Sequence, residues 1–163
     1  MLDKAVEDGV DSVGQTGDPS ATELSLPAIL AAYECIKTSE LIVRTPLWRD
    51  CNKRFFHLTT ALPISSLLKS FRLHMKMENA QIASSFKIRG VFNQISQKSS
   101  ALRAAGSAPV TMSAGNYGKA FAYCLSKLEG IKPGMVVMPT LAPQERVDLI
   151  RGMGCQVQQV VKD

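Results

Sequence analysis

Histidine, cysteine and aromatic residues are scarce in this 163-residue sequence, and their scarcity argues against several kinds of site. There are two histidines, and they do not have the spacing of metal ligands. The cysteines are Cys35, Cys51, Cys124 and Cys155. Because they contain no Cys-x-x-Cys pair, we expect neither a zinc site nor a disulfide framework, and we interpret them as reduced thiols in a cytosolic protein.

Long apolar runs, blocks of positive charge and nucleotide-binding loops are also missing. No run approaches the length that spans a bilayer, and the acidic N-terminus lacks the apolar segment of a signal peptide. The net charge of +5 comes from scattered residues, without the basic stripe of a nucleic-acid surface. The sequence contains no G-x-G-x-x-G, P-loop, G-x-S-x-G or H-E-x-x-H motif. We therefore expect a cytoplasmic protein with no nucleic-acid or membrane partner.

A regular alternation of apolar strands and helical patterns fills the sequence after about residue 65. The content of 45% hydrophobic and 20% charged residues is typical of a globular protein. The expected strands are 71–77, 109–112, 135–138 and 155–161, and the expected helices are 86–105, 116–129 and 142–152. Strands joined by helices of this size form right-handed βαβ units, so we predict an α/β fold with a parallel sheet flanked by helices.

The first 64 residues are less regular. Residues 1–20 are acidic, rich in small polar residues and without periodicity, which predicts a disordered tail. Residues 26–39 form an amphipathic helical pattern with Ser25 as N-cap, and 42–45 is a short strand. Residues 51–64 have no clear pattern and indicate an insertion, either a loop or an error in the coding sequence. The predicted division is a tail at 1–20, an N-terminal helix, strand and insertion at 21–64, and an α/β domain at 65–163.

One lysine lies in an unusual chemical setting. A polar turn ends in Ser84, Ser85 and Phe86, and Lys87 then opens a long helical pattern. The positive end of the helix macrodipole disfavours an ammonium ion there. A neutral lysine amine is what covalent bonding to an aldehyde requires. A lone lysine at a helix start is by default an exposed surface residue, so its neighbours carry the prediction.

Three motifs in the sequence point to one family. They are Thr45-Pro46-Leu47, then Lys76-x-Glu78-Asn79-x-Gln81 followed by Ser85-Phe86-Lys87-Ile88-Arg89-Gly90, and last Ser113-Ala114-Gly115-Asn116-Tyr117-Gly118. In this order they resemble the motifs of the fold-type II pyridoxal-phosphate enzymes, which include threonine and serine dehydratases and serine racemase. The resemblance covers roughly residues 25–161, apart from 51–64. It implies the small domain of this tryptophan synthase β-like fold, preceded by the start of the large domain.

The resemblance also implies a role for each motif residue. Lys87 would bond to the aldehyde of pyridoxal 5′-phosphate and later take the substrate Cα proton, Phe86 would pack near the cofactor, and Asn116 would bond its 3′ oxygen. The residues expected to bind an amino-acid substrate are Ser85, Ser113, Ala114, Gly115, Asn116 and Tyr117. Backbone N–H groups at a helix start form such an anion site. Without the resemblance, Ser85 and Asn116 would be helix caps and Phe86 a buried helix residue.

Three positions depart from the family pattern, and a fourth bears on the choice of reaction. Ser84 stands where glycine is usual, Tyr117 replaces a histidine, and Lys119 replaces a common glutamine. Ala114 stands where racemases of the family have a serine that serves as a second acid or base. Because alanine cannot carry a proton, the resemblance favours elimination over racemisation.

The implied reaction is β-elimination from L-threonine or L-serine, which gives a 2-oxo acid and ammonia. Family chains are about twice as long, and their glycine-rich phosphate cradle and the residue that meets the pyridine nitrogen have no counterpart here. We therefore expect weak cofactor retention and little turnover by this chain alone. The alternatives are a serine racemase relative, a simple anion-binding module, and a non-catalytic fragment that binds a partner. Homo-oligomers and association with a full-length homologue are both compatible with the sequence.

Overall fold

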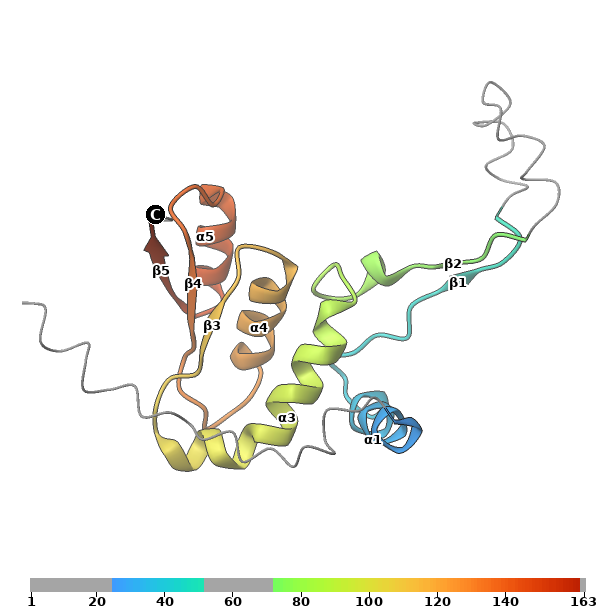
Figure 1. The fold of residues 1–163 in the computed structure, drawn as a ribbon, viewed down its shortest axis with the longest axis horizontal. Helices are drawn as coiled ribbons and strands as arrows, with labels where there is room; N and C mark the ends of the chain where they lie inside the picture. Colours follow the sequence, from blue (N-terminus) through green and yellow to red (C-terminus); the bar gives the residue numbers. More distant parts are fainter. Residues whose placement is uncertain (1–24, 52–71, 162–163) are drawn as a thin grey trace, which may run out of the picture.

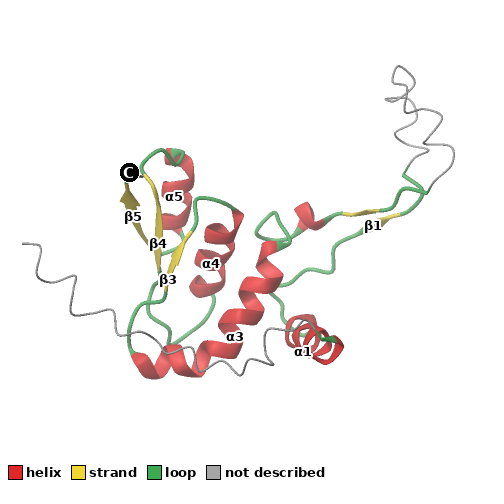
Figure 2. Cartoon of the chain, viewed as in Figure 1, coloured by secondary structure: helices red, strands yellow, loops and turns green. Residues whose placement is uncertain are grey.

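The computed structural model describes residues 25–51 and 72–161 (Figures 1 and 2). Its elements are α1 (Leu26–Lys37), β1 (Leu47–Trp48), β2 (Met75–Lys76), the 3₁₀ helix η4 (Glu78–Ala80), α3 (Lys87–Ala105), β3 (Val110–Met112), α4 (Asn116–Ser126), β4 (Met135–Pro139), α5 (Gln144–Gly152) and β5 (Gln156–Val160). The tail predicted for 1–20 and residues 52–64 of the predicted insertion lie outside the described residues.

A three-stranded parallel sheet forms the centre of the fold, with β4 between β3 and β5. Val136 of β4 is in register with Thr111 on one side and Val157 on the other. The chain passes from β3 to β4 through α4, and from β4 to β5 through α5 (Figure 1). This arrangement confirms the α/β class and the parallel sheet that the alternation of strands and helices predicts.

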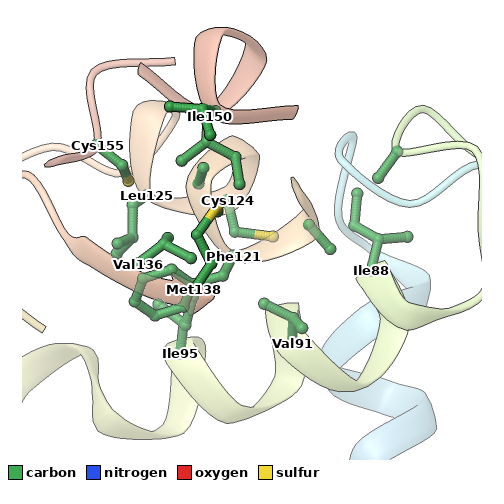
Figure 3. Packing of buried hydrophobic residues seen from close by; sticks show 14 residues of the cluster. Ile88, Val91, Ile95, Phe121, Cys124, Leu125, Val136, Met138, Ile150 and Cys155 are labelled. Atoms are coloured by element: carbon green, nitrogen blue, oxygen red, sulfur yellow. The ribbon is translucent and has the colours of Figure 1, made fainter. Parts of the chain in front are cut away.

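An apolar core lies between this sheet and the helices (Figure 3). Val136 and Met138 of β4 are fully buried, whereas their neighbours along the strand are only partly covered. Helix α3 contributes buried side chains at the spacing of one helix face, namely Ile88, Val91 and Ile95. Helix α4 is held between α3 and the sheet and buries Ala120, Phe121, Ala122, Cys124 and Leu125. This core fixes the starts of α3 and α4 relative to each other.

The opposite face of the sheet is open in the described part of the chain. Its side chains alternate with the buried ones, and Val110 and Met112 of β3 are 62% and 79% exposed. We call the outward-facing apolar residues of the three strands the open sheet face. They are Val110, Met112, Met135, Val137 and Val160.

The described part of the strand predicted at 71–77, residues 72–77, does not join the parallel sheet. Its one strand is β2, which pairs antiparallel with β1. The strand predicted at 42–45 is also wrong, because β1 begins after Pro46. The backbone of Val43 is instead bonded to a side chain: its N–H donates to Gln81 Oε1 at 3.1 Å, and its C=O accepts from Gln81 Nε2 at 2.7 Å.

The helix ends agree in part with the sequence prediction. Helix α1 has the predicted cap at Ser25, and α3 ends at Gly106, which has a left-handed φ of 60°. Ser85 does not cap α3. The N-cap is Phe86, whose backbone is already helical at φ −63° and ψ −17° and whose side chain makes no capping bond. Asn116 is the first residue of α4 rather than its cap, and α4 ends at Ser126, before the predicted end at 129.

All four cysteines are free, and Cys51, Cys124 and Cys155 are buried. Burial raises the pKa of the Cys124 thiol to about 12 and also raises that of Cys155. In residues 25–51 and 72–161, no three histidine, cysteine or acidic side chains come together as a metal site. No helix among the described residues is long and apolar enough to cross a membrane.

Candidate active site

Lys87 is the first residue of α3, and its side chain is exposed. Its Nζ lies 4.8 Å from the centroid of the Phe86 ring. Phe86 is 58% exposed, so it is not the core residue that helix periodicity alone suggests. An amine and a flat apolar surface therefore lie side by side at the start of this helix.

Ser85 is buried next to this pair. It is 8% exposed, and its Oγ has no hydrogen-bond partner in the described part of the protein. A buried hydroxyl without a partner costs about 1–3 kcal/mol. Such groups are rare in folded proteins, and a catalytic role is one of their recognised explanations. Ser85 is therefore available to a ligand beside Lys87.

The turn between β3 and α4 is organised by Ser113. Its Oγ accepts hydrogen bonds from the N–H groups of Gly115 at 3.2 Å and Gly118 at 3.0 Å. These bonds occupy the acceptor sites of Ser113, so the residue braces the turn and retains only its hydroxyl proton for a ligand. No described residue accepts from the N–H groups of Asn116 and Tyr117, which lie at the positive end of α4. Two backbone donors are thus free to bind an anion.

Gly118 allows this turn to form. A Cβ added to it would lie 2.7 Å from the carbonyl oxygen of Ser113 and 3.3 Å from Val136 Cγ1. The first distance is too short for any real side chain, so only glycine lets α4 approach the end of β3 this closely.

Two side-chain hydrogen bonds join the Lys87 segment to the Asn116 segment. Lys119 Nζ donates to Ser84 Oγ at 3.1 Å, and the Tyr117 hydroxyl donates to Gln94 Oε1 at 2.7 Å. Ser84 has a left-handed φ of 60°, which suits the glycine usual in the resembled motif. The structure therefore brings the two predicted segments together, and the three departures from the family pattern form the contacts between them.

A polar network that the sequence analysis did not assign lies on another side of α3. We call it the Glu78 network, and its members are Thr45, Lys76, Glu78, Gln81 and Arg89. Glu78 Oε2 accepts from Arg89 Nε, and Glu78 Oε1 accepts from Arg89 Nη2, each at 2.9 Å. Thr45 Oγ1 donates to Glu78 Oε1 at 2.6 Å. The Arg89 bonds, with those from Thr45 and Gln81, hold the pKa of the Glu78 carboxyl at about 2, and the same contact raises the pKa of Arg89.

The sequence contains a hint of this network. All five residues occur in the family motifs, and two of them, Glu78 and Gln81, lie between the expected strand at 71–77 and the expected helix at 86–105. Thr45 and Gln81 are both 3% exposed, and buried polar side chains of this kind are nearly always paired. Short polar motifs without periodicity therefore indicate side chains that are paired in the folded protein. The pairing itself depends on tertiary contacts across more than thirty residues.

A cavity of about 670 Å³ lies between α1 and the Glu78 network. Lys37, Arg44, Lys76 and Arg89 give its walls a positive charge, with Glu78 as the one acidic lining residue. Lys87 and Asn116 do not line it, so the cavity is separate from the predicted site.

Comparisons with known proteins identify relatives of the sequence. A family model described as "Pyridoxal-phosphate dependent enzyme" matches residues 42–163. The L-threonine ammonia-lyase of Thermotoga maritima is 40% identical over 101 residues, which cover 60% of this chain and 24% of that protein. The serine racemase of Homo sapiens is 40% identical over 104 residues, which cover 62% of this chain and 30% of that protein.

Solved structures show the same relationship. The crystal structure of serine racemase from Dictyostelium discoideum matches with a TM-score of 0.64 and 30% identity, covering 85% of this chain and 40% of that one. The chain thus spans between about a quarter and two fifths of the length of these three relatives.

Proposed function

Because the chain belongs to the pyridoxal-phosphate-dependent enzyme family, we propose that it carries the lysine-bearing part of an active site for β-elimination from L-threonine or L-serine. The products would be a 2-oxo acid and ammonia. The observation that supports this proposal most directly is the amine of Lys87 beside the exposed ring of Phe86 at the start of α3. Catalysis by the whole protein is part of the proposal, since the chain spans only a fraction of its relatives.

The residues at the start of α3 and α4 fit the cofactor of this family. Lys87 supplies the amine that bonds to an aldehyde, and Phe86 supplies an apolar face for a flat ring. Ser85 offers a buried hydroxyl without a partner, and Asn116 would bond the 3′ oxygen. When bound, pyridoxal 5′-phosphate supplies an electron sink for the charge that develops at the substrate Cα.

The chain's own residues would then bind the substrate and move its proton. The free N–H groups of Asn116 and Tyr117 would bind the substrate carboxylate at the positive end of α4. Lys87 would take the Cα proton as a general base. Ala114 lies in the same turn and has no group that could return a proton to another face of the substrate. This supports elimination over racemisation.

A relative of serine racemase is the second candidate, because proteins with that name are 40% and 38% identical to parts of this chain. The two candidates differ in their products. Elimination from L-serine gives pyruvate, whereas racemisation gives D-serine. If D-serine forms faster than pyruvate, racemisation replaces elimination as the proposed reaction.

Covalent labelling tests the role of Lys87. The chain is mixed with pyridoxal phosphate, reduced with borohydride, digested and mapped by mass spectrometry. We expect the label on Lys87, and we expect Lys87→Ala to remove it, because Lys87 carries the amine that lies beside the exposed Phe86 ring. Lys98→Ala serves as the matched control, since Lys98 is an exposed lysine further along the same helix. Equal labelling of Lys87 and Lys98, or no label on Lys87, would contradict the proposal.

A further inference from the structure

We propose that Glu78 is a positioning residue for Lys87: through Arg89 it fixes the rotation of the first turn of α3, and with it the direction in which the amine of Lys87 is presented. The inference rests on the proposed function of Lys87 and adds a residue that does not touch the reacting atoms.

The first turn of α3 needs an anchor of this kind. Phe86 is the N-cap residue and makes no side-chain capping bond, and Ser85 makes none either. The N–H of Arg89 donates to the C=O of Phe86, the residue before the helix, at 3.0 Å. Helices without a side-chain cap fray at this end, which is where Lys87 lies.

Arg89 is well placed to fix the rotation of α3 about its own axis. In an α-helix, residues two apart point in directions that differ by about 200°. Arg89 and Lys87 therefore project from nearly opposite sides of α3. Ile88 lies between them and is fully buried in the core. If Arg89 is held on one side of α3 and Ile88 is held in the core, the rotation of the helix is fixed, and Lys87 projects from the side opposite Arg89.

The contact between Glu78 and Arg89 is geometrically specific. Both carboxylate oxygens of Glu78 accept from the guanidinium of Arg89, at 2.9 Å each, so the two planar groups face each other. A two-point contact of this kind restrains rotation as well as distance. The side chains are only partly accessible, at 30% for Arg89 and 21% for Glu78, which reduces screening by solvent.

Glu78 is itself held by Thr45 directly and by Gln81, which connects it to the backbone of Val43. Thr45 Oγ1 donates to Glu78 at 2.6 Å, and Gln81 Nε2 donates to it at 3.4 Å. The Gln81 amide also bonds both the N–H and the C=O of Val43. Lys76 Nζ donates to the C=O of Thr45 at 2.6 Å. The anchor of α3 is therefore bound to backbone from a distant part of the sequence.

The test measures how fast Lys87 is labelled in the full 163-residue chain. Pyridoxal phosphate is added, samples are reduced with borohydride at timed intervals, and the rate of label on Lys87 is divided by the folded fraction from circular dichroism. We expect Glu78→Gln to lower this rate about 10- to 100-fold, since misplacement by about 1 Å has effects of this size. Glu78→Asp keeps the charge and should restore part of the rate.

The control is Glu34→Gln, which removes an ion pair with Lys37 on the exposed surface of α1 and should leave the rate unchanged. A residue that only stabilised the fold would change the folded fraction and not the rate per folded molecule. If Glu78→Gln is labelled as fast as the unsubstituted chain, the positioning role is overturned and the proposed function stands. If Lys87 is not labelled in the unsubstituted chain, both are overturned.

Discussion

Glu78 should make the stability of the chain depend on pH. Its hydrogen bonds, those from Arg89 foremost, lower the pKa of its carboxyl from 4.5 to about 2. Because the folded-state pKa is the lower one, the carboxylate stabilises the folded chain fully above about pH 4.5, and this contribution is lost as the pH falls through about 2. We expect Glu78→Gln to lower the free energy of unfolding by roughly 1–3 kcal/mol at pH 7.

Urea unfolding of both proteins at several pH values checks this expectation. The difference in free energy of unfolding between the unsubstituted chain and Glu78→Gln should shrink between pH 4.5 and pH 2. Effects of pH on the rest of the chain are common to both proteins and cancel in the difference. A difference that stays constant down to pH 2 would contradict the assigned role of the carboxylate.

Ser84 is a second residue whose substitution has a predictable sign. Its φ of 60° costs a residue with a Cβ about 1–2 kcal/mol. The exposed hydrogen bond that Ser84 accepts from Lys119 stabilises the folded chain by about 0.5–1.5 kcal/mol. We therefore expect Ser84→Gly to raise the free energy of unfolding by up to about 1 kcal/mol. Ser84→Ala keeps the backbone strain and loses the hydrogen bond, so it should lower the free energy of unfolding. Thermal unfolding curves of the two variants should therefore move in opposite directions, and a shift of both in the same direction would contradict this explanation.

At the scale of elements, two glycines in helices should respond to alanine with opposite signs. Alanine is normally the better helix residue by up to about 1 kcal/mol. Gly90 of α3 has nothing within 4 Å of an added Cβ, so Gly90→Ala should be stabilising. Gly118 of α4 has the Ser113 carbonyl at 2.7 Å, so Gly118→Ala should cost about 1–3 kcal/mol through overpacking.

Chemical denaturation of the two glycine variants checks this pair. Gly90→Ala is the matched control, since it makes the same substitution in a helix where the new methyl group has space. If both variants are stabilised, α4 does not approach β3 as closely as described. Loss of stability in Gly118→Ala should also loosen the turn in which the N–H groups of Asn116 and Tyr117 lie.

The elements differ in how well the sequence predicts them. Helix α3 is predicted well, because Ile88, Val91 and Ile95 repeat at one period over a long window and Gly106 stops it. The β1–β2 pair is missed, since each strand has two residues and its partner is distant in the sequence. The alternative interpretation of Ser85 as a helix cap is wrong, because the N-cap residue is Phe86, whose backbone is already helical. Motif resemblance points to Lys87 and Asn116, whereas the role of Glu78 needs the folded contacts.

At the scale of the whole molecule, the open sheet face should cause association. Parallel sheets are normally covered on both faces, and here Val110 and Met112 remain largely exposed. Exposed apolar surface of this kind favours binding to another chain. We expect the chain to form concentration-dependent oligomers in sedimentation velocity, and Met112→Lys to weaken them.

Ser100→Lys is the control for this experiment. It adds the same charge on the exposed surface of α3, away from the sheet, and should leave association unchanged. If both lysine variants weaken association equally, net charge and not the sheet face is responsible. A single monomeric species at every concentration would exclude association through this face.

The order in which the sheet can assemble follows from its topology. No strand of the sheet pairs through a tight turn, because α4 separates β3 from β4 and α5 separates β4 from β5. During synthesis on the ribosome, Val110 and Met112 can therefore pair only after β4 has left the exit tunnel. The other edge of β4 can pair only after residues 156–160 have emerged. Contacts between distant residues also form slowly. A nascent chain of this kind thus exposes an unpaired strand edge to chaperones from the emergence of β3 until that of β5.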